Sequence, residues 1–276
     1  MNGKNIRISR LFNPETGNSV IIPIDHGAVL GNIAGLTDPV GTLKELIDLR
    51  IDATLINPGI AKIAEGFFVS RLAPARILTA DIPLFSCTPG GQEGVIQHDL
   101  LCSVEDAVRG NFDAMKVLLV YGTDKEILIK NIKAVGTLAN ECDKWGMPLM
   151  VEPVLWGNGI PDDRKKDVTL IENAARIALE IGADILKMPY TGNREEFADL
   201  VKRFSVPVVI LGGPKMKSTR DILDVAYDST WAGSKGIVFG RNVWQYPDMK
   251  ALVKALQDIV HKGSTVDEVM KRYNII

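Results

Sequence analysis

The chain has 276 residues, of which 46% are hydrophobic and 24% are charged, and its formal net charge is −2. This composition excludes disorder, collagen and a coiled coil, and a near-neutral chain without a basic block is not expected to bind nucleic acid. The length fits either two domains or one closed α/β barrel of roughly 250 residues.

The first residues, Met1 to Ser9, lack the apolar core of a signal peptide, and no apolar stretch approaches the ~20 residues that span a bilayer. We therefore expect a cytoplasmic protein without a membrane partner. The three cysteines form no C-x-x-C pair and share no metal-ligand spacing with the three histidines. The sequence predicts neither a disulfide framework nor a metal site.

Short runs rich in Val, Ile and Leu alternate along the chain with longer segments of helical spacing. The eight predicted strands are 19–24, 53–57, 83–86, 114–120, 148–152, 184–188, 207–211 and 236–239. The predicted helices include 40–49, 124–145, 169–181, 194–204, 218–232 and 249–261. Strands this apolar are typical of a parallel sheet that is buried on both faces.

No linker rich in Pro, Gly or Ser separates these units, so we predict one domain over residues 1–276 with an α/β fold, a single (β/α)8 TIM barrel. A doubly wound open sheet is the alternative, although no G-x-G-x-x-G turn follows the first strand. Two long connections, 88–103 and 153–168, are expected at the C-terminal face, where barrels carry their ligand loops. Residues 12–18 are expected to close the opposite end.

Charged residues within or at the ends of apolar strands are informative, because a strand buried on both faces has no favourable place for a charge. They are Asp25, Lys116, Glu152 and Lys187. In a closed barrel, the alternation of side chains allows all four to point toward the axis near the C-terminal mouth. We therefore expect them to share one pocket.

Lys187 is the candidate nucleophile of this pocket. An amine that is partly removed from water and lies near a second cation is driven toward its neutral form, which attacks a ketone to form a Schiff base. Lys116 is the candidate second cation, and Glu152 or Asp25 could carry protons. Alternatively, Lys187 reaches solvent along its aliphatic stem, Lys116 and Glu152 form a structural ion pair, and Asp25 caps a turn.

Each of the last two predicted strands is followed by a turn that contains glycine. The two turns are Leu211 to Lys215 and Phe239 to Asn242. Glycines let backbone N–H groups approach an anion, and barrels frequently bind phosphate after strands seven and eight. The predicted phosphate site consists of Gly212, Gly213, Lys215, Gly240 and Arg241. Ordinary turn chemistry is the alternative for each turn taken singly.

Two histidines adjoin these elements. His26 follows Asp25, and we interpret it as a histidine that is hydrogen-bonded within the fold, outside the catalytic set. The role of His98, in the long connection after the third predicted strand, stays open.

Four stretches of the chain together resemble the DeoC/LacD type of class I aldolase family, which joins archaeal-type fructose-bisphosphate aldolases, aminodideoxyheptulosonate synthases and LsrF-like thiolases. The stretches are IPIDHG, GADILKMPYTGN, VVILGGPK and GIVFGRNVWQ. The resemblance implies a TIM barrel with Lys187 as the Schiff-base lysine and Asp25 as the acid of strand one. It also implies that a substrate phosphate is held by Gly212, Gly213, Gly240 and Arg241.

One stretch departs from many of these aldolases, because the tyrosine that they carry after strand five is missing from VEPVLWGNG. The stretches DAMKVLLVYGTDKE and PLMVEPVLW are instead similar to the tagatose-bisphosphate and sulfosugar aldolases. That likeness implies Lys116 as a polarising cation and Glu152 as the acid/base. The resemblance further implies a homo-oligomer, a pentamer or a decamer.

The expected activity is that of a metal-independent aldolase without a cofactor. It would cleave or form a phosphorylated ketose, with fructose 1,6-bisphosphate as the candidate, giving dihydroxyacetone phosphate and an aldehyde phosphate. Transaldolase- or thiolase-type transfer by the same lysine is an alternative, and a phosphosugar-binding sensor is another. The expected partner is a small phosphorylated ketose or aldehyde.

Overall fold

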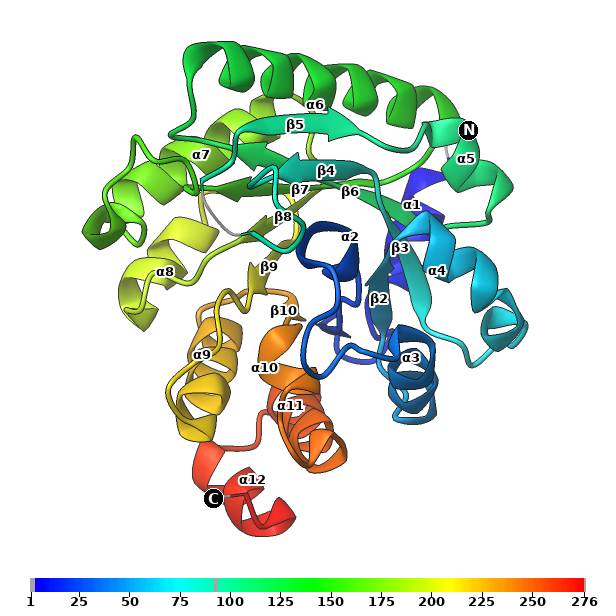
Figure 1. Cartoon of the computed structure of the whole chain (residues 1–276). Helices are drawn as coiled ribbons and strands as arrows, with labels where there is room; N and C mark the ends of the chain where they lie inside the picture. Colours follow the sequence, from blue (N-terminus) through cyan, green and yellow to red (C-terminus); the bar gives the residue numbers. More distant parts are fainter. Residues whose placement is uncertain (1–2, 92–93, 276) are drawn as a thin grey trace.

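The structure, a computed structural model, describes residues 3–91 and 94–275. Eight parallel strands close into a barrel in the order β1-β10-β9-β8-β7-β6-β3-β2 (Figure 1). Their bounds are β1 Ser19–Ile21, β2 Ala53–Ile56, β3 Ala75–Thr79, β6 Ala114–Val120, β7 Leu149–Val154, β8 Ile185–Met188, β9 Val208–Leu211 and β10 Gly236–Val238. The predicted TIM barrel is confirmed, and the open doubly wound alternative is wrong.

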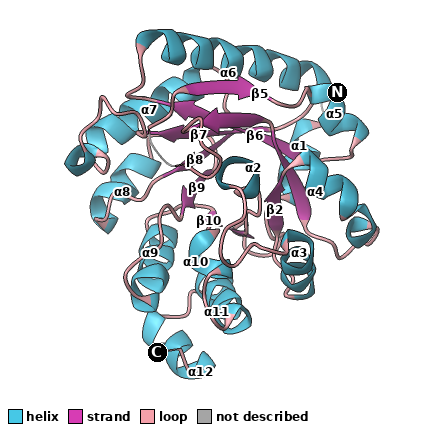
Figure 2. Ribbon diagram, in the orientation of Figure 1, coloured by secondary structure: helices cyan, strands magenta, loops and turns pink. Residues whose placement is uncertain are grey.

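Helices surround the strands on the outside of the barrel (Figure 2). The longer ones are α3 Pro39–Asp48, α6 Lys125–Trp145, α7 Val168–Glu180, α8 Arg194–Val201, α9 Thr219–Trp231, α11 Met249–Lys262 and α12 Val266–Tyr273. The shorter ones are α1 Lys4–Arg10, α2 Gly27–Leu30, α4 Pro58–Ile63, α5 Val104–Arg109 and α10 Arg241–Trp244, with 3-10 turns η1 Glu65–Phe68 and η2 Asp162–Arg164. Side-chain caps set several starts, since Ser103, Ser218 and Thr265 each form a capping box.

Two apolar layers hold the barrel together. Strand residues that point outward pack against the helices, and the alternate residues fill the inside of the barrel. The inner set includes Ile21, Leu55, Ile77, Met150 and Val209, all fully buried. Because both faces of every strand are covered, polar side chains within the strands are confined to positions where they find partners.

The N-terminal segment closes the end of the barrel at which the strands begin. Leu11 is fully buried within the inner cluster, and Phe12 packs against that cluster. The hydroxyl of Ser19, at the start of β1, donates a hydrogen bond of 2.6 Å to the carbonyl of Leu11. The expected closure by residues 12–18 is confirmed for Phe12. Leu11, which is fully buried in the cluster, lies one residue before the predicted range.

The prediction of a third barrel strand at residues 83–86 is wrong. The barrel strand is β3, and residues 81–84 form β4 (Asp81–Leu84), which pairs antiparallel with β5 (Gln97–Leu100) in a separate hairpin. Pro83 has no backbone N–H to donate. It therefore suits a strand of a two-stranded hairpin better than a barrel strand, which is hydrogen-bonded on both sides. The predicted connection 88–103 therefore contains β5, and its residues 92 and 93 lie outside the described part.

The true third strand carries a buried charge, Arg76, which has partners elsewhere in the fold. Its guanidinium lies 4.9 Å from the ring centroids of both Phe68 and Phe112. It also donates hydrogen bonds to the carbonyls of Gly110 and Asn111, at 2.7 and 3.0 Å. The charge is thus satisfied by tertiary contacts that the local sequence does not reveal.

Leu11→Ala should destabilise the protein by about 2–5 kcal/mol, because truncation leaves a cavity in a tightly packed interior. Ile6→Ala, which removes a side chain that is 71% exposed on α1, should change the free energy of unfolding by less than about 0.5 kcal/mol. Urea unfolding of both variants measures the two values, and equal effects would contradict the closure by Leu11.

Candidate active site

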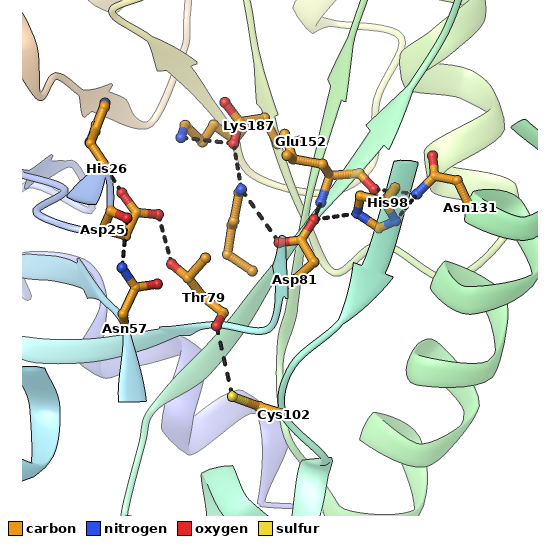
Figure 3. Close-up of polar contacts among 12 residues, drawn as sticks. Asp25, His26, Asn57, Thr79, Asp81, His98, Cys102, Asn131, Glu152 and Lys187 are labelled. Carbon is orange, nitrogen blue, oxygen red and sulfur yellow. Dashed lines mark hydrogen bonds and ion pairs between the residues drawn. The ribbon is translucent and has the colours of Figure 1, made fainter. Parts of the chain in front are cut away.

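Three charged side chains meet inside the barrel from three adjacent strands. Lys116 lies on β6, Glu152 on β7 and Lys187 on β8. Figure 3 shows Glu152 and Lys187 side by side. Oε2 of Glu152 lies 2.9 Å from Nζ of Lys187 and 3.1 Å from Nζ of Lys116. All three side chains are at most 8% exposed. One carboxylate oxygen is therefore shared by two ammonium groups that water hardly reaches.

A fourth charge, which the sequence analysis missed, lies beside Lys116. Oδ1 of Asp81, the first residue of β4, lies 3.7 Å from Nζ of Lys116. Burial lowers the pKa of Lys116, but the negative charges of Asp81, Glu152 and Asp25 outweigh it, and the pKa ends above its ordinary value. Lys116 is thus held as a cation.

Asp25 is fixed by its neighbours just after β1. Its Oδ2 accepts a hydrogen bond of 2.7 Å from the hydroxyl of Thr79, and its main-chain carbonyl accepts one of 2.6 Å from the amide of Asn57. Nδ1 of His26 lies 3.3 Å from Oδ1. Burial opposes ionisation, yet His26 and the nearby lysines lower the pKa of Asp25 well below its usual range. The carboxylate therefore stays charged next to the lysine pair.

The register of β1 explains how Asp25 reaches this place. The regular strand ends at Ile21, but the N–H groups of Ile22 and Ile24 still donate to the carbonyls of Ala53 and Leu55 in β2, at 3.1 and 2.9 Å. Pro23 lies between them and has no N–H to donate. The extended chain therefore continues to Asp25, as the predicted strand 19–24 implies.

The two predicted phosphate turns are tied together by a residue that the sequence analysis did not single out. The side-chain amide of Asn242 donates to the carbonyls of Gly212 and Pro214, each at 3.2 Å. Its oxygen accepts a hydrogen bond of 2.8 Å from the N–H of Met216. Asn242 is buried on α10 and so fixes the turn after β9 against the turn after β10.

Both turns need glycine at a specific position. A Cβ on Gly240 would lie 2.7 Å from Cε1 of His26, and Gly213 has a φ of +64°. A side chain at either position is therefore disfavoured, by a clash in one case and by the left-handed backbone in the other. His26 thereby links the two halves of the site, because the ring that lies against Gly240 also faces Asp25.

Arg241 carries a positive charge into the turn after β10. Its burial lowers the pKa of the guanidinium, and its buried Nε has no hydrogen-bond partner among residues 3–91 and 94–275. A half-buried cation with an unsatisfied donor is suited to an anion. Lys215, by contrast, is exposed and lines a groove that also contains Ser218 and Tyr246.

An apolar cluster covers another part of the mouth. It is formed by Leu118, Val120, Val154 and Val95, with Phe85, Trp156 and Leu211 packed against it. The rings of Phe85 and Trp156 lie 5.8 Å apart. Such a wall keeps water away from charges below it, which strengthens their interaction.

The described part of the chain contains no group of three or more His, Cys, Asp or Glu side chains that could hold a metal ion. Within the same residues, every helix is too short or too polar to cross a membrane. Cys87, Cys102 and Cys142 are free cysteines.

The sequence profile of the DeoC/LacD family aldolases matches residues 19–246. An uncharacterised aldolase of Saccharolobus solfataricus is 32% identical over 276 aligned positions, covering 98% of this chain and 99% of the relative. A 3-hydroxy-5-phosphonooxypentane-2,4-dione thiolase of Escherichia coli is 30% identical over 274 positions, covering 98% and 87%. Relatives of nearly equal identity thus bear the names of different activities.

A solved structure is also similar. It is an archaeal fructose-1,6-bisphosphate aldolase with its catalytic lysine covalently bound to the carbinolamine intermediate of the substrate. The TM-score is 0.79 at 28% sequence identity, and the match covers 93% of this chain and 98% of that structure.

Asp25→Asn should lower the free energy of unfolding at pH 7. It should also reduce the loss of that free energy as the pH is lowered. The pKa of Asp25 is lower in the folded protein than the ~3.9 of an unfolded chain, so its stabilisation is present above that value and lost as pH falls below it. We expect the stability lost between pH 7 and pH 3 to be at least about 1 kcal/mol smaller in the variant. Urea unfolding at both pH values measures this, with the exposed Asp163→Asn as control.

Proposed function

The chain belongs to the DeoC/LacD family of aldolases, and we propose that it is a Schiff-base aldolase that cleaves or forms a phosphorylated ketose. Fructose 1,6-bisphosphate is the substrate to test first, with dihydroxyacetone phosphate and an aldehyde phosphate as products. The observation that carries the proposal is the buried carboxylate of Glu152, 2.9 Å from Lys187 and 3.1 Å from Lys116.

In the proposed first step, Lys187 passes a proton to Glu152, which already contacts its ammonium group. The neutral amine then adds to the ketone carbon, and Glu152 returns the proton to the departing hydroxyl, which leaves as water. The product is a protonated imine. Lys116 is the cation that polarises the substrate oxygen and holds Glu152 in place.

In the second step, the protonated imine accepts the electron pair of the breaking carbon–carbon bond. Glu152 removes the proton from the hydroxyl on the far carbon of the breaking bond, that carbon becomes the carbonyl of the aldehyde, and the aldehyde leaves. The remaining enamine is protonated at carbon, and water then hydrolyses the imine to release the second product and the free amine. Asp25 is the proposed orienting acid, since its charge faces both lysines.

The phosphate of the substrate is proposed to bind at the turns after β9 and β10. Support comes from the half-buried guanidinium of Arg241, whose Nε has no hydrogen-bond partner in the described part of the chain. Gly213 and Gly240 offer backbone N–H groups beside it, whereas the N–H of Gly212, also predicted for this site, already donates to the carbonyl of Val238 at 3.1 Å. Lys215, which is exposed nearby, is the proposed outer cation of this site.

Lys187→Ala should abolish the adduct that borohydride traps with dihydroxyacetone phosphate, because no amine remains to form the imine. Glu152→Gln should lower kcat by about 10²–10⁴-fold, the range of acid/base catalysis. The exposed Lys202→Ala is the control and should retain both properties. Mass spectrometry and a coupled cleavage assay measure them. Activity that is lost with EDTA and restored by zinc would contradict the mechanism.

Arg241→Ala should raise the KM for a phosphorylated ketose by about 10- to 100-fold, since hydrogen bonds to a charged group contribute about 1.5–3 kcal/mol. Arg241→Lys, which keeps the charge, should lose less. The unphosphorylated sugar is the control substrate, and the wild type and the Ala variant should convert it equally poorly. An unchanged KM for the phosphorylated ketose would remove Arg241 from the site.

Transfer to an acceptor is a second candidate function. The E. coli relative that bears a thiolase name is 30% identical, which is close to the 32% of the aldolase relative. The same lysine could serve either reaction. Turnover of a ketose phosphate that requires an added aldehyde or thiol acceptor would favour transfer over simple cleavage.

A further inference from the structure

Figure 3 shows a chain of three buried polar residues, Asp81, His98 and Asn131, beside Glu152. The proposed mechanism uses none of the three. Nε2 of His98, on β5, lies 2.6 Å from Oδ2 of Asp81. Nδ1 of the same ring lies 3.0 Å from Nδ2 of Asn131 on α6. The side chains of His98 and Asp81 are 1% and 0% exposed. Polar groups this deeply buried are costly unless each finds a partner.

The hydrogen bonds of Asn131 determine where the proton of His98 lies. The oxygen of the amide accepts from the N–H of Val120 at 2.8 Å, and its NH₂ group donates to the carbonyl of Leu118 at 2.9 Å. These two backbone partners fix the orientation of the amide. Because the NH₂ group only donates, Nδ1 of His98 must accept, and the ring proton is on Nε2. His98 is therefore neutral and donates to Asp81.

The neutral histidine leaves the negative charge of Asp81 intact. Oδ2 of Asp81 accepts from both His98 and the N–H of Leu118, the latter at 2.7 Å. Oδ1 has no hydrogen-bond partner within the described residues and lies 3.7 Å from Nζ of Lys116. The two donors thus hold the carboxylate so that its free oxygen faces Lys116.

The two lysines consequently differ in their surroundings. Lys187 pairs with Glu152, whereas Lys116 pairs with both Glu152 and Asp81. If one ammonium group must lose a proton to Glu152, the group with the additional buried carboxylate loses it less readily.

We propose that the Asp81–His98–Asn131 chain determines which lysine is the nucleophile, by holding the positive charge on Lys116 and leaving Lys187 to form the imine. This proposal rests on the proposed Schiff-base function. His98 and Asn131 are positioning residues that act through Asp81 and Lys116. In the covalent step Lys187 gives one proton to Glu152, adds its electron pair to a carbonyl carbon and loses one water, while Lys116 keeps its proton.

Other titratable groups face this network and are constant among the variants below. Glu152 and Asp25 act on Lys116 with their negative charges. Cys102, next to the hairpin, has a pKa raised to about 11 by its burial and by nearby carboxylates that include Asp81. A cysteine label on Cys102 would therefore be distinguished by mass mapping from a label on a lysine.

Asn131→Asp tests the proposal with a change of almost no volume. An aspartate at this position only accepts hydrogen bonds, so Nδ1 of His98 gains a proton and donates to it, and His98 becomes an imidazolium whose charge competes with Lys116 for Asp81. The pKa of Lys116 should then fall, so Lys116 should react at lower pH than in wild type. Asp81→Asn, which removes the carboxylate charge, should act in the same direction.

The readout is the lysine that reacts. Acetylacetone condenses with a neutral amine to give an enaminone and water, and peptide mapping locates the label across a range of pH. Wild type should be labelled at Lys187, whereas Asn131→Asp and Asp81→Asn should also be labelled at Lys116, increasingly as pH rises. His98→Gln, which offers an amide N–H to Asp81, should retain the wild-type pattern. Asn140→Asp adds the same charge on the exposed face of α6 and is the matched control.

Two results would overturn the proposal. One is labelling that stays confined to Lys187 with the wild-type pH profile in both charge variants, measured on protein with a native circular dichroism spectrum. The other is a ¹⁵N NMR spectrum of wild type in which His98 is an imidazolium at pH 7. Asp81→Asn keeps the test decisive if Asn131→Asp does not fold.

Comparing acetylacetone labelling with the borohydride trapping of sugar phosphates separates this proposal from the proposed function. If fructose 1,6-bisphosphate and dihydroxyacetone phosphate give no adduct while acetylacetone labels Lys187, the sugar-phosphate function fails and the selection between lysines is supported. If the sugar phosphates are trapped on Lys187 in wild type and in both charge variants alike, the function is supported and the selection fails.

Discussion

The site depends on a single carboxylate oxygen that is shared by two ammonium groups where water is scarce. Glu152 contacts Lys187 and Lys116 from the strand between them. In water such pairs contribute little, but inside the barrel each charge strongly affects the protonation of the others. The rest of the molecule serves to bring these groups together without leaving any of them unpaired. This explains why the charged residues come from several strands and from the segment after β1 rather than from one loop.

The barrel satisfies this requirement by simple geometry. Alternate residues of parallel strands point inward, so apolar side chains fill the lower layer and charged ones the layer above it. Asp25 and Asp81 reach that layer from segments that follow β1 and β3. The glycine turns after β9 and β10 lie at the same end of the strands, which places the proposed phosphate site at the same end as the lysine pair.

Much of this arrangement could be predicted from the sequence. Charged residues in apolar strands are rare enough to stand out, and Asp25, Lys116, Glu152 and Lys187 were identified in this way. Asp81 has the same signal, since it follows the apolar run that ends at Thr79, but the misplaced third strand concealed it. In that strand Arg76 is stabilised by the ring of Phe112 and the carbonyl of Gly110, both more than 30 positions away in sequence. Local patterns cannot show such compensation.

The supporting residues were beyond sequence reasoning for a different reason. His98 and Asn131 are 33 positions apart, and each alone resembles an ordinary polar residue of a loop or a helix. The role of Asn242 is likewise visible only in the folded chain, where its side chain joins the turns after β9 and β10. What identifies these residues is the completeness of their hydrogen bonding, which exists only in the folded chain.

The N-terminal segment that closes the barrel has contacts that constrain the order in which the protein can assemble during synthesis. Lys4 on α1 pairs with Asp143 and Asp184, which lie 139 and 180 positions later in the chain. A ribosome therefore releases the first helix long before its partners exist. The ion pair of Lys4 with Asp184 can form only after the segment before β8 has been made, so the contacts of this helix are completed late although the helix itself is synthesised first.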